Sequence, residues 1–176
     1  MNHVTRLLTI DDTAELTELL RRNRDFLRPW DPERDDEFFS EEKQAEISRN
    51  ALEAHANGSM VPLVIQNQTG GIAGRLNING IVRGAFQSAS LGYWVSAHDN
   101  GAGLATKAVA DAIALSRGEL GLHRLQAETI VHNVASQRVL QKNGFVRYGL
   151  APNYLKISGR WQDHVLYQHI NEEDHA

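Results

Sequence analysis

The sequence predicts a single α/β domain in which several helices cover a mixed β-sheet. Three observations support this prediction: the order of the expected elements, the chain length, and one long helix with a wide apolar face. The elements follow the order β, α, α, three strands, α, β, α, β, β, and 176 residues suit one domain with a full hydrophobic core. We expect the domain to span residues 1–170, with a short acidic tail over residues 171–176.

The first part of the chain predicts one strand and two helices. Residues 4–10 favour a strand, and Asp11 or Asp12 can cap a following helix that ends before Pro29. Prolines then favour a loop, until Ser40 caps a second helix with an acidic first turn. These two helices are expected to cover part of the sheet.

Three strands are expected in the middle of the chain. Residues 60–66 and the segment from Ile72 onward form a predicted hairpin, because the Thr69–Gly71 turn joins them. Residues 88–95 form the third strand of this series. Antiparallel pairing of consecutive strands is therefore expected here.

The rest of the chain alternates helix and strand. Small apolar residues over 103–117 give a broad helical face suited to lie closely on a sheet. A strand over 124–131 and a helix over 133–143 follow, and the helix stops at a glycine. Two final strands are expected over 145–155 and 163–170.

Composition excludes several classes of protein. The chain has no cysteine, and its eight histidines contain no His-x-x-x-His pair, so we expect no metal site. A net charge of -4 argues against nucleic-acid binding, which needs a basic face. No apolar run is long enough to cross a membrane and no secretory signal is visible, so we expect a cytoplasmic protein that does not bind membranes.

The most informative segment is residues 95–106, where a strand enters a glycine-containing loop that opens a helix. The first amides of a helix lack partners and lie at its positive dipole end, so such a loop can bind phosphate. An ordinary helix start would look the same. Neither the Walker A pattern nor the dinucleotide fingerprint fits, because Thr106 stands where the fingerprint needs its third glycine.

The same loop resembles motif A of the GNAT superfamily of N-acetyltransferases, which has Gln or Arg, two residues, Gly, one residue, and Gly or Ala. Here the motif begins at Asn100, which departs from the usual Gln or Arg. A second signature of the family stands at the expected distance, as Asn133 and Ser136 followed by Gly144-Phe145. The two signatures together are far more specific than either one.

Further motifs are similar to those of the ribosomal-protein-alanine N-acetyltransferase branch of this superfamily. The likeness covers nearly the whole chain and implies a GNAT fold, with a mixed, splayed central sheet that holds acetyl-CoA where two strands part. It also implies direct attack of an acceptor amine on the thioester, without an acyl-enzyme. The motifs are Phe26-Leu27-x-Pro29-Trp30, Leu91-Gly92-Tyr93-Trp94, Leu122-His123-Arg124, His132-Asn133, Tyr154-Leu155 and Trp161-x-Asp163-His164-Val165.

The resemblance implies specific coenzyme contacts. A backbone N–H near Trp94 and Val95 would face the thioester carbonyl, and the glycine loop would hold the pyrophosphate. Asn133 would bind the pantetheine arm, although its position also suits an ordinary helix cap. Ser136 would protonate the leaving thiolate. The expected coenzyme-binding residues are Trp94, Val95, Asn100, Gly101, Ala102, Gly103, Leu104, Ala105, Thr106, Asn133 and Ser136.

The general base is the least defined part of the predicted site. Many members of the family place a glutamate where Ser90 or Gln126 stands in this chain. Glu128 lies on the same strand face as Gln126, because side chains alternate along a strand, and is the nearest carboxylate. An exposed strand acid is the alternative interpretation of Glu128, and His132 and His164 are alternative bases.

The missing family glutamate favours an acceptor that is easy to deprotonate. An α-amino group has a pKa of about 7.8 and a lysine side chain about 10.4, a difference of about 3.5 kcal/mol. We therefore expect an N-terminal α-amine as acceptor, on a ribosomal or another protein. The expected acceptor-side residues are Trp30, Phe39, Tyr93, Asp163 and His164.

Several alternatives stay open at this point. The acidic stretch over residues 31–37 can attract a basic protein N-terminus, or can simply be a solvated loop. The acceptor can instead be a small amine, such as an antibiotic, a polyamine or an amino acid. A catalytically silent acyl-CoA-binding module and a nucleotide-binding oxidoreductase are the rivals from other classes. The oligomeric state is open, with a homodimer among the options.

Overall fold

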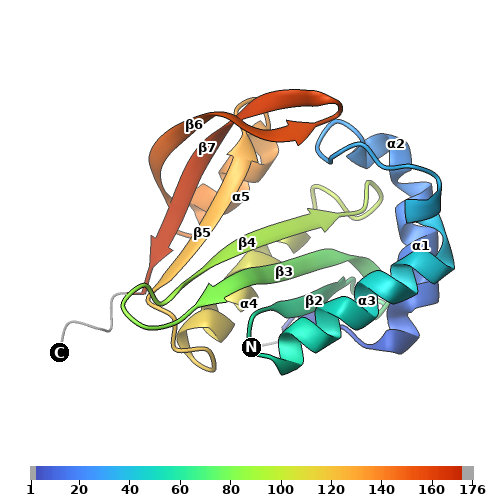
Figure 1. Cartoon of the computed structure of the whole chain (residues 1–176), viewed down its shortest axis with the longest axis horizontal. Helices are drawn as coiled ribbons and strands as arrows, with labels where there is room; N and C mark the ends of the chain where they lie inside the picture. The colour runs from blue at the N-terminus through green and yellow to red at the C-terminus, as the bar shows by residue number, and fades with distance from the viewer. Residues whose placement is uncertain (1–2, 172–176) are drawn as a thin grey trace.

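A computed structural model of the chain describes residues 3–171 and contains a seven-stranded sheet in the order β1-β2-β3-β4-β5-β7-β6 (Figure 1). The predicted order of strands and helices is confirmed, with short helical turns added between the main elements. The strands are β1 (Thr5–Leu7), β2 (Val61–Gln66), β3 (Ile72–Val82), β4 (Ser88–Val95), β5 (Arg124–Ile130), β6 (Val146–Ile157) and β7 (Arg160–Ile170). The helices are α1 (Thr13–Arg22), α2 (Arg24–Leu27), α3 (Glu41–Ala56), α4 (Leu104–Arg117) and α5 (Val134–Lys142), with 3-10 turns η1 (Ile10–Asp12) and η2 (Glu37–Phe39).

The predicted splay of the sheet is present between β4 and β5. These neighbours run parallel and pair over only three residues of β4, Ser88 to Ser90, whereas every other neighbouring pair in the sheet is antiparallel. Beyond Ser90, β4 continues beside β3 and β5 continues beside β7. Figure 1 shows the two halves of the sheet diverging from this point.

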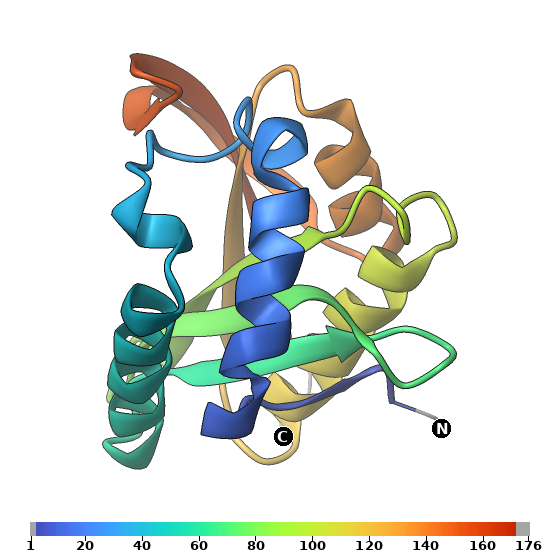
Figure 2. The same ribbon diagram turned by 90° about the vertical axis from the view of Figure 1, so that its right-hand side faces the viewer.

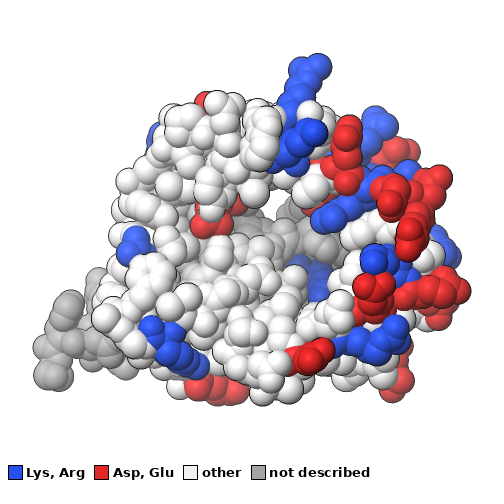
Figure 3. Space-filling model, viewed as in Figure 1, with Lys and Arg blue, Asp and Glu red and all other residues white. Residues whose placement is uncertain are grey.

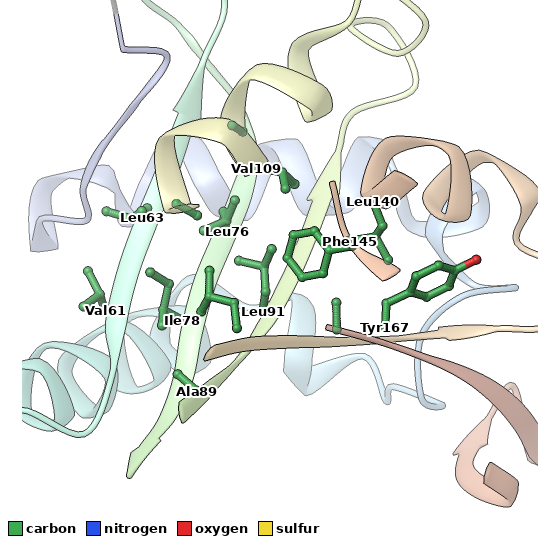
Figure 4. Packing of buried hydrophobic residues seen from close by; sticks show 14 of the residues in the cluster. Val61, Leu63, Leu76, Ile78, Ala89, Leu91, Val109, Leu140, Phe145 and Tyr167 are labelled. Carbon is green, nitrogen blue, oxygen red and sulfur yellow. The ribbon is translucent and has the colours of Figure 1, made fainter. Parts of the chain in front are cut away.

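Helices cover both faces of the sheet. Figure 2 shows α1 and α3 over one face, with α4 and α5 on the opposite side. The larger core cluster lies between the sheet and α4 and α5, and Figure 4 shows it running from Val61 and Leu63 to Leu140 and Tyr167. A smaller cluster, which includes Leu16 and Val64, joins the other face to α1 and α3. The small residues of α4, such as Ala108 and Ala112, are fully buried, as the wide apolar face predicted.

Two predictions for the N-terminal region are wrong. The first strand is only three residues long, because the chain turns into η1 at Ile10. Asp12 does not cap α1: its carboxylate instead accepts hydrogen bonds from the Thr9 amide at 2.8 Å and from the Arg6 guanidinium at 2.7 and 2.8 Å. Ser40, by contrast, caps α3 by accepting from the Lys43 amide at 3.1 Å, as expected.

The C-terminal hairpin is longer than the sequence predicts. β6 and β7 meet at Ser158 and Gly159, and both residues have positive φ angles, of 47° and 76°. Asn171, which was assigned to the acidic tail, is buried, and its side chain donates to the Leu122 carbonyl. Residues 172–176 lie outside the described residues. Within residues 3–171, no helix is long and apolar enough to cross a membrane.

The Arg6–Asp12 pair should stabilise the start of the fold. Hydrogen bonds from Arg6 hold the pKa of Asp12 below its ordinary value, although burial acts in the opposite direction. Asp12→Ala should lower the free energy of unfolding by about 2 kcal/mol at pH 7, because the Arg6 guanidinium and the Thr9 amide lose their partner. Chemical denaturation of the variant and the wild type measures this difference.

The same difference should depend on pH in a defined direction. A carboxyl group whose pKa is lower in the folded state than in the unfolded state stabilises the fold at pH values above its unfolded pKa of about 3.9. This contribution is lost as the pH falls through the folded pKa. The neighbouring exposed Asp11 is the control, because Asp11→Ala should change stability by less than about 0.5 kcal/mol. Equal losses for the two variants would contradict the role of the pair.

Candidate active site

A cleft of about 600 Å³ lies where β4 and β5 part. Helix α5, the Trp30 segment after α2 and the hairpin residues Leu155 and Ile157 also line it. Figure 3 shows this hollow in the face of the molecule, with charged side chains gathered along its right-hand edge over the N-terminal helices. The strands β3 to β7, the helices α2, α4 and α5, and the loops that carry Trp30 and Asn100 therefore converge on one cavity.

Alternation along β4 gives this cleft two chemically different sides. Tyr93 packs with the cluster beneath α4 and α5, whereas Trp94 packs with the cluster beneath α1 and α3. We call these the α5 side and the α1 side of the cleft. The Trp94 ring therefore lies on the side away from α5, so any contact of Trp94 with a ligand on the α5 side would come from its backbone.

A pair of hydroxyl groups marks the α5 side. Tyr93 Oη and Ser136 Oγ are 3.0 Å apart, and either can donate the hydrogen bond between them. Burial raises the pKa of the Tyr93 phenol to about 12, although the Ser136 hydrogen bond acts in the opposite direction. The phenol is therefore protonated at neutral pH and can donate a hydrogen bond into the cleft. The sequence motifs pointed to both residues but not to their contact.

Asn133 holds Ser136 in place. The Asn133 side-chain oxygen accepts from the Ser136 amide at 3.1 Å and caps α5, as the alternative interpretation of Asn133 expected. Asn133 also lines the cleft. Capping and a ligand contact are compatible, because the amide nitrogen of this side chain is not used by the cap.

The glycine loop before α4 presents free backbone amides. Gly101 and Gly103 have φ angles of 81° and 79°, and a Cβ atom at either would meet nothing within 4 Å. The Gly101 amide donates to Asn100 Oδ1 at 3.0 Å, so the asparagine side chain already uses that donor. Within residues 3–171, the amides of Ala102 to Thr106 make no hydrogen bond. These free donors at a helix start fit an anionic group such as a pyrophosphate.

Only part of this loop faces the cleft itself. Asn100 and Ala105 line the cleft, whereas Gly101 to Leu104 and Thr106 are not among its lining residues. Gly101, Ala102 and Gly103 are exposed. The free amides of the loop are thus open to solvent next to the part of the cleft that Asn100 lines.

Glu128 brings a carboxylate to the α1 side. It lies on β5 beyond Gln126, the last residue of β5 that pairs with β4. Its Oε2 accepts a hydrogen bond from the Ser90 hydroxyl at 2.9 Å. Glu128 lines the cleft. Burial is the main cause that raises the pKa of the Tyr154 phenol, and the negative charge of Glu128 raises it further. The Ser90 hydroxyl of β4 therefore holds the carboxylate that this chain carries on the neighbouring strand β5.

Two charged residues of the cleft were not assigned individual roles from the sequence. Arg75 projects from β3 into the cleft, and burial lowers the pKa of its guanidinium. Asp31, from the acidic stretch, also lines the cleft, and burial raises the pKa of its carboxyl group. No local motif marks Arg75, because only the pairing of β3 with β4 brings it to the site.

The predicted acceptor-side residues divide into two groups. Trp30 and His164 line the cleft together with Tyr93. Phe39 does not: it lies in a neighbouring cavity of about 530 Å³, beneath Arg24. Asp163 is exposed and does not line the cleft, because its carboxylate accepts from the Asn153 amide at 2.9 Å within the hairpin.

The alternative bases are also placed by the structure. His132 is exposed, and its ring packs against Trp30 with centroids 5.6 Å apart. His164 is buried, and its Nδ1 lies 3.0 Å from the Gln162 carbonyl. Of the three candidates, Glu128 presents the only anionic oxygen to the cleft.

Comparison with known proteins decides the family. Residues 4–146 match the model of the acetyltransferase (GNAT) domain. The chain belongs to the GNAT acetyltransferase family. It is therefore an N-acetyltransferase that uses acetyl-CoA, and the predicted fold, enzyme class and coenzyme are confirmed.

Relatives extend this likeness over almost the full chain. The [Ribosomal protein uS5]-alanine N-acetyltransferase of Escherichia coli is 34% identical over 165 residues, which cover 93% of this chain and 84% of that protein. The structure of a ribosomal-protein-S5-alanine acetyltransferase from Vibrio fischeri is 31% identical, with a TM-score of 0.92, and covers 96% of this chain and 93% of that chain. Mycobacterium smegmatis RimJ, solved in complex with CoA-disulfide, is 30% identical, also with a TM-score of 0.92, and covers 98% of this chain and 83% of that chain.

The geometry of this acetyltransferase fits its coenzyme. The free amides next to the cleft suit the pyrophosphate, and the cleft between β4 and β5 leads to the Tyr93–Ser136 pair. Within residues 3–171, no group of three or more His, Cys, Asp or Glu side chains gathers in a way that could hold a metal ion. The residues that contact each part of the coenzyme stay a prediction.

Gly103→Val should weaken coenzyme A binding by at least about tenfold, equivalent to 1.4 kcal/mol. The new side chain would occupy the open space in front of the loop amides and strain a backbone with a φ of 79°. Isothermal titration calorimetry with coenzyme A measures the loss of affinity.

The matched control is Gly84→Val. Gly84 has a φ angle of 71° and equally open surroundings, but lies in the loop before β4, at the end of the strand remote from the cleft. Both variants should lose similar thermal stability, while only Gly103→Val loses affinity. Unchanged affinity in Gly103→Val would remove the loop from coenzyme binding.

Proposed function

We propose that this enzyme transfers the acetyl group of acetyl-CoA to the N-terminal α-amine of a protein. The observation that supports this best is the two-sided cleft. Glu128 offers a carboxylate on the α1 side, and the Tyr93–Ser136 pair offers hydroxyl groups on the α5 side. The acceptor enters on the α1 side and the thioester lies on the α5 side, with the gap between β4 and β5 joining them.

The proposed reaction is a direct displacement. The neutral amine nitrogen attacks the thioester carbonyl carbon and forms the new C–N bond. The C–S bond then breaks, and the electron pair leaves with the sulfur as a thiolate. Glu128 binds the amine and takes up the proton that the nitrogen loses as the C–N bond forms. A β4 amide near Val95 binds the developing oxyanion.

The Tyr93–Ser136 pair stabilises the departing thiolate by hydrogen bonding. A thiol has a pKa of about 8.5, so full proton transfer from a phenol with a pKa of about 12 would cost about 5 kcal/mol. Donating a hydrogen bond without transfer avoids that cost and still stabilises the negative charge where it develops. The thiolate can then take its proton from water after it leaves the cleft.

The chemistry of the site favours an α-amine over a lysine side chain. Glu128 is a weak base, and deprotonating a lysine costs about 3.5 kcal/mol more than deprotonating an α-amine. The relatives from Escherichia coli and Vibrio fischeri are named for acetylating the alanine of a ribosomal protein. A basic protein N-terminus would also suit Asp31, the one acid of the acidic stretch that lines the cleft.

Peptides that begin with alanine should be acetylated, and the same peptides with a blocked N-terminus should not, even when they contain lysine. Release of the coenzyme A thiol measures turnover, and mass spectrometry of the product locates the acetyl group. Spermidine and an aminoglycoside are the small-amine comparison. An enzyme that acetylates those amines and ignores free peptide N-termini would overturn the protein acceptor.

Tyr93→Phe should lower kcat by about 10-fold to 100-fold, because one donor to the developing negative charge is lost. The KM for acetyl-CoA should change by less than about twofold, since the ring and its packing are retained. Because burial raises the pKa of Tyr93 to about 12, wild-type activity should show no loss from phenol ionisation up to about pH 10.

Tyr148→Phe is the control for this substitution. Tyr148 is exposed, accepts a hydrogen bond from Gln126 and does not line the cleft. Its variant should keep the wild-type kcat. A Tyr93→Phe enzyme as fast as the wild type at saturating substrates would exclude the phenol from the reaction.

A further inference from the structure

We propose that Arg75 binds the carbonyl oxygen of the first residue of the acceptor peptide, next to the amine that is acetylated. This inference rests on the proposed function and narrows its substrate class. The acceptor would be recognised as an α-amino acyl group, with its amine at Glu128 and its carbonyl oxygen at Arg75.

The strand register places Arg75 on the acceptor side. Arg75 pairs with Trp94 and Asn77 pairs with Gly92, so all four residues share the α1 side of the sheet. Glu128 reaches the same side, because its hydrogen-bond partner Ser90 lies on the Gly92 face of β4. The cation and the anion therefore stand on the two strands that flank β4.

The guanidinium of Arg75 is only partly satisfied by the protein. Its Nε donates to Asn77 Oδ1 at 3.2 Å, and in the described residues the other two nitrogens make no hydrogen bond. No carboxylate lies within 4.0 Å of it in that part of the chain. Burial lowers its pKa, and no acid offsets this effect. The guanidinium is half-buried at the cleft, so its two unused donors can bind a ligand that carries an acceptor oxygen.

Gly92 leaves room for that ligand between the two charges. It is exposed, and a Cβ atom there would approach only the Asn79 side chain, at 3.7 Å. Where β4 pairs with both neighbours, β3 and β5 are about 10 Å apart, twice the usual strand spacing, and beyond Ser90 β4 and β5 diverge further. An amine and the carbonyl oxygen of the same residue are about 3 Å apart, so the long Arg75 and Glu128 side chains can reach them from opposite sides.

A neutral carbonyl fits the site better than a second charge. Arginine presents paired donors in a fixed plane, which suits carbonyl and carboxylate oxygens alike. The cleft is otherwise lined mostly by apolar and aromatic residues, with Asp31 as its second acid. A peptide carbonyl adds no charge to this setting, and the peptide can continue beyond it toward solvent.

The test compares acceptors with and without the carbonyl oxygen in the Arg75→Met enzyme. The acceptors are a peptide that begins with alanine, alaninamide, free alanine and isopropylamine, which keeps the branched amine but has no oxygen. We expect kcat/KM to fall by about 10-fold to 100-fold for the peptide and for alaninamide. For isopropylamine and for the KM of acetyl-CoA, we expect changes of less than about twofold.

Two further variants separate recognition from folding. Arg75→Lys keeps the charge but loses the paired donors, so it should recover part of the peptide activity. Arg49→Met removes an exposed arginine of α3 and should leave every acceptor unchanged. Calorimetry of peptide binding in the presence of coenzyme A gives a second readout, in which Arg75→Met should again lose about tenfold or more in affinity.

Three results would overturn the inference. These are unchanged peptide activity in Arg75→Met, an equal loss for isopropylamine, and a loss confined to free alanine, which would mean carboxylate recognition. Failure of the proposed function gives a different result. In that case the wild-type enzyme itself would acetylate neither the peptide nor alaninamide.

Discussion

The early end of the pairing between β4 and β5 is the constraint on which the rest of the structure depends. Three paired residues hold the two halves of the sheet together, and beyond Ser90 each strand turns to its other neighbour. The facing edges therefore keep backbone groups that no strand uses, and a cavity of about 600 Å³ opens between them. A continuous sheet of the same strands would leave no gap for a thioester.

Alternation along the strands then separates the chemistry of the reaction. Tyr93 points to the α5 side, where Ser136 meets it, whereas Gly92 and Trp94 belong to the α1 side with Glu128 and Arg75. In the proposed mechanism, the leaving group and the incoming amine are thus handled from opposite faces of one sheet.

Local patterns predicted much of the site and failed in recognisable places. Asn133 and Ser136, which the family motif marked, do line the cleft, and the glycine loop lies at the start of α4, as a few neighbouring residues predicted. Phe39 lines the neighbouring cavity and not the cleft, because its aromatic character does not decide which of two adjacent cavities it enters. Asp163 was placed by its motif, but its carboxylate is used within the hairpin, at the Asn153 amide.

The sequence by itself determined the order of the elements, because hydrophobic periodicity and turn residues are properties of neighbouring residues. The resemblance of its motifs to those of the GNAT superfamily gave the family and the coenzyme. The tertiary structure alone decided which side chains meet. Tyr93 and Ser136 are 43 positions apart, and Ser90 and Glu128 are 38 apart. Arg75 reaches the cleft only because β3 pairs with β4 in one register. Strand register and the splay of a sheet depend on packing across the whole domain, so no local pattern specifies them.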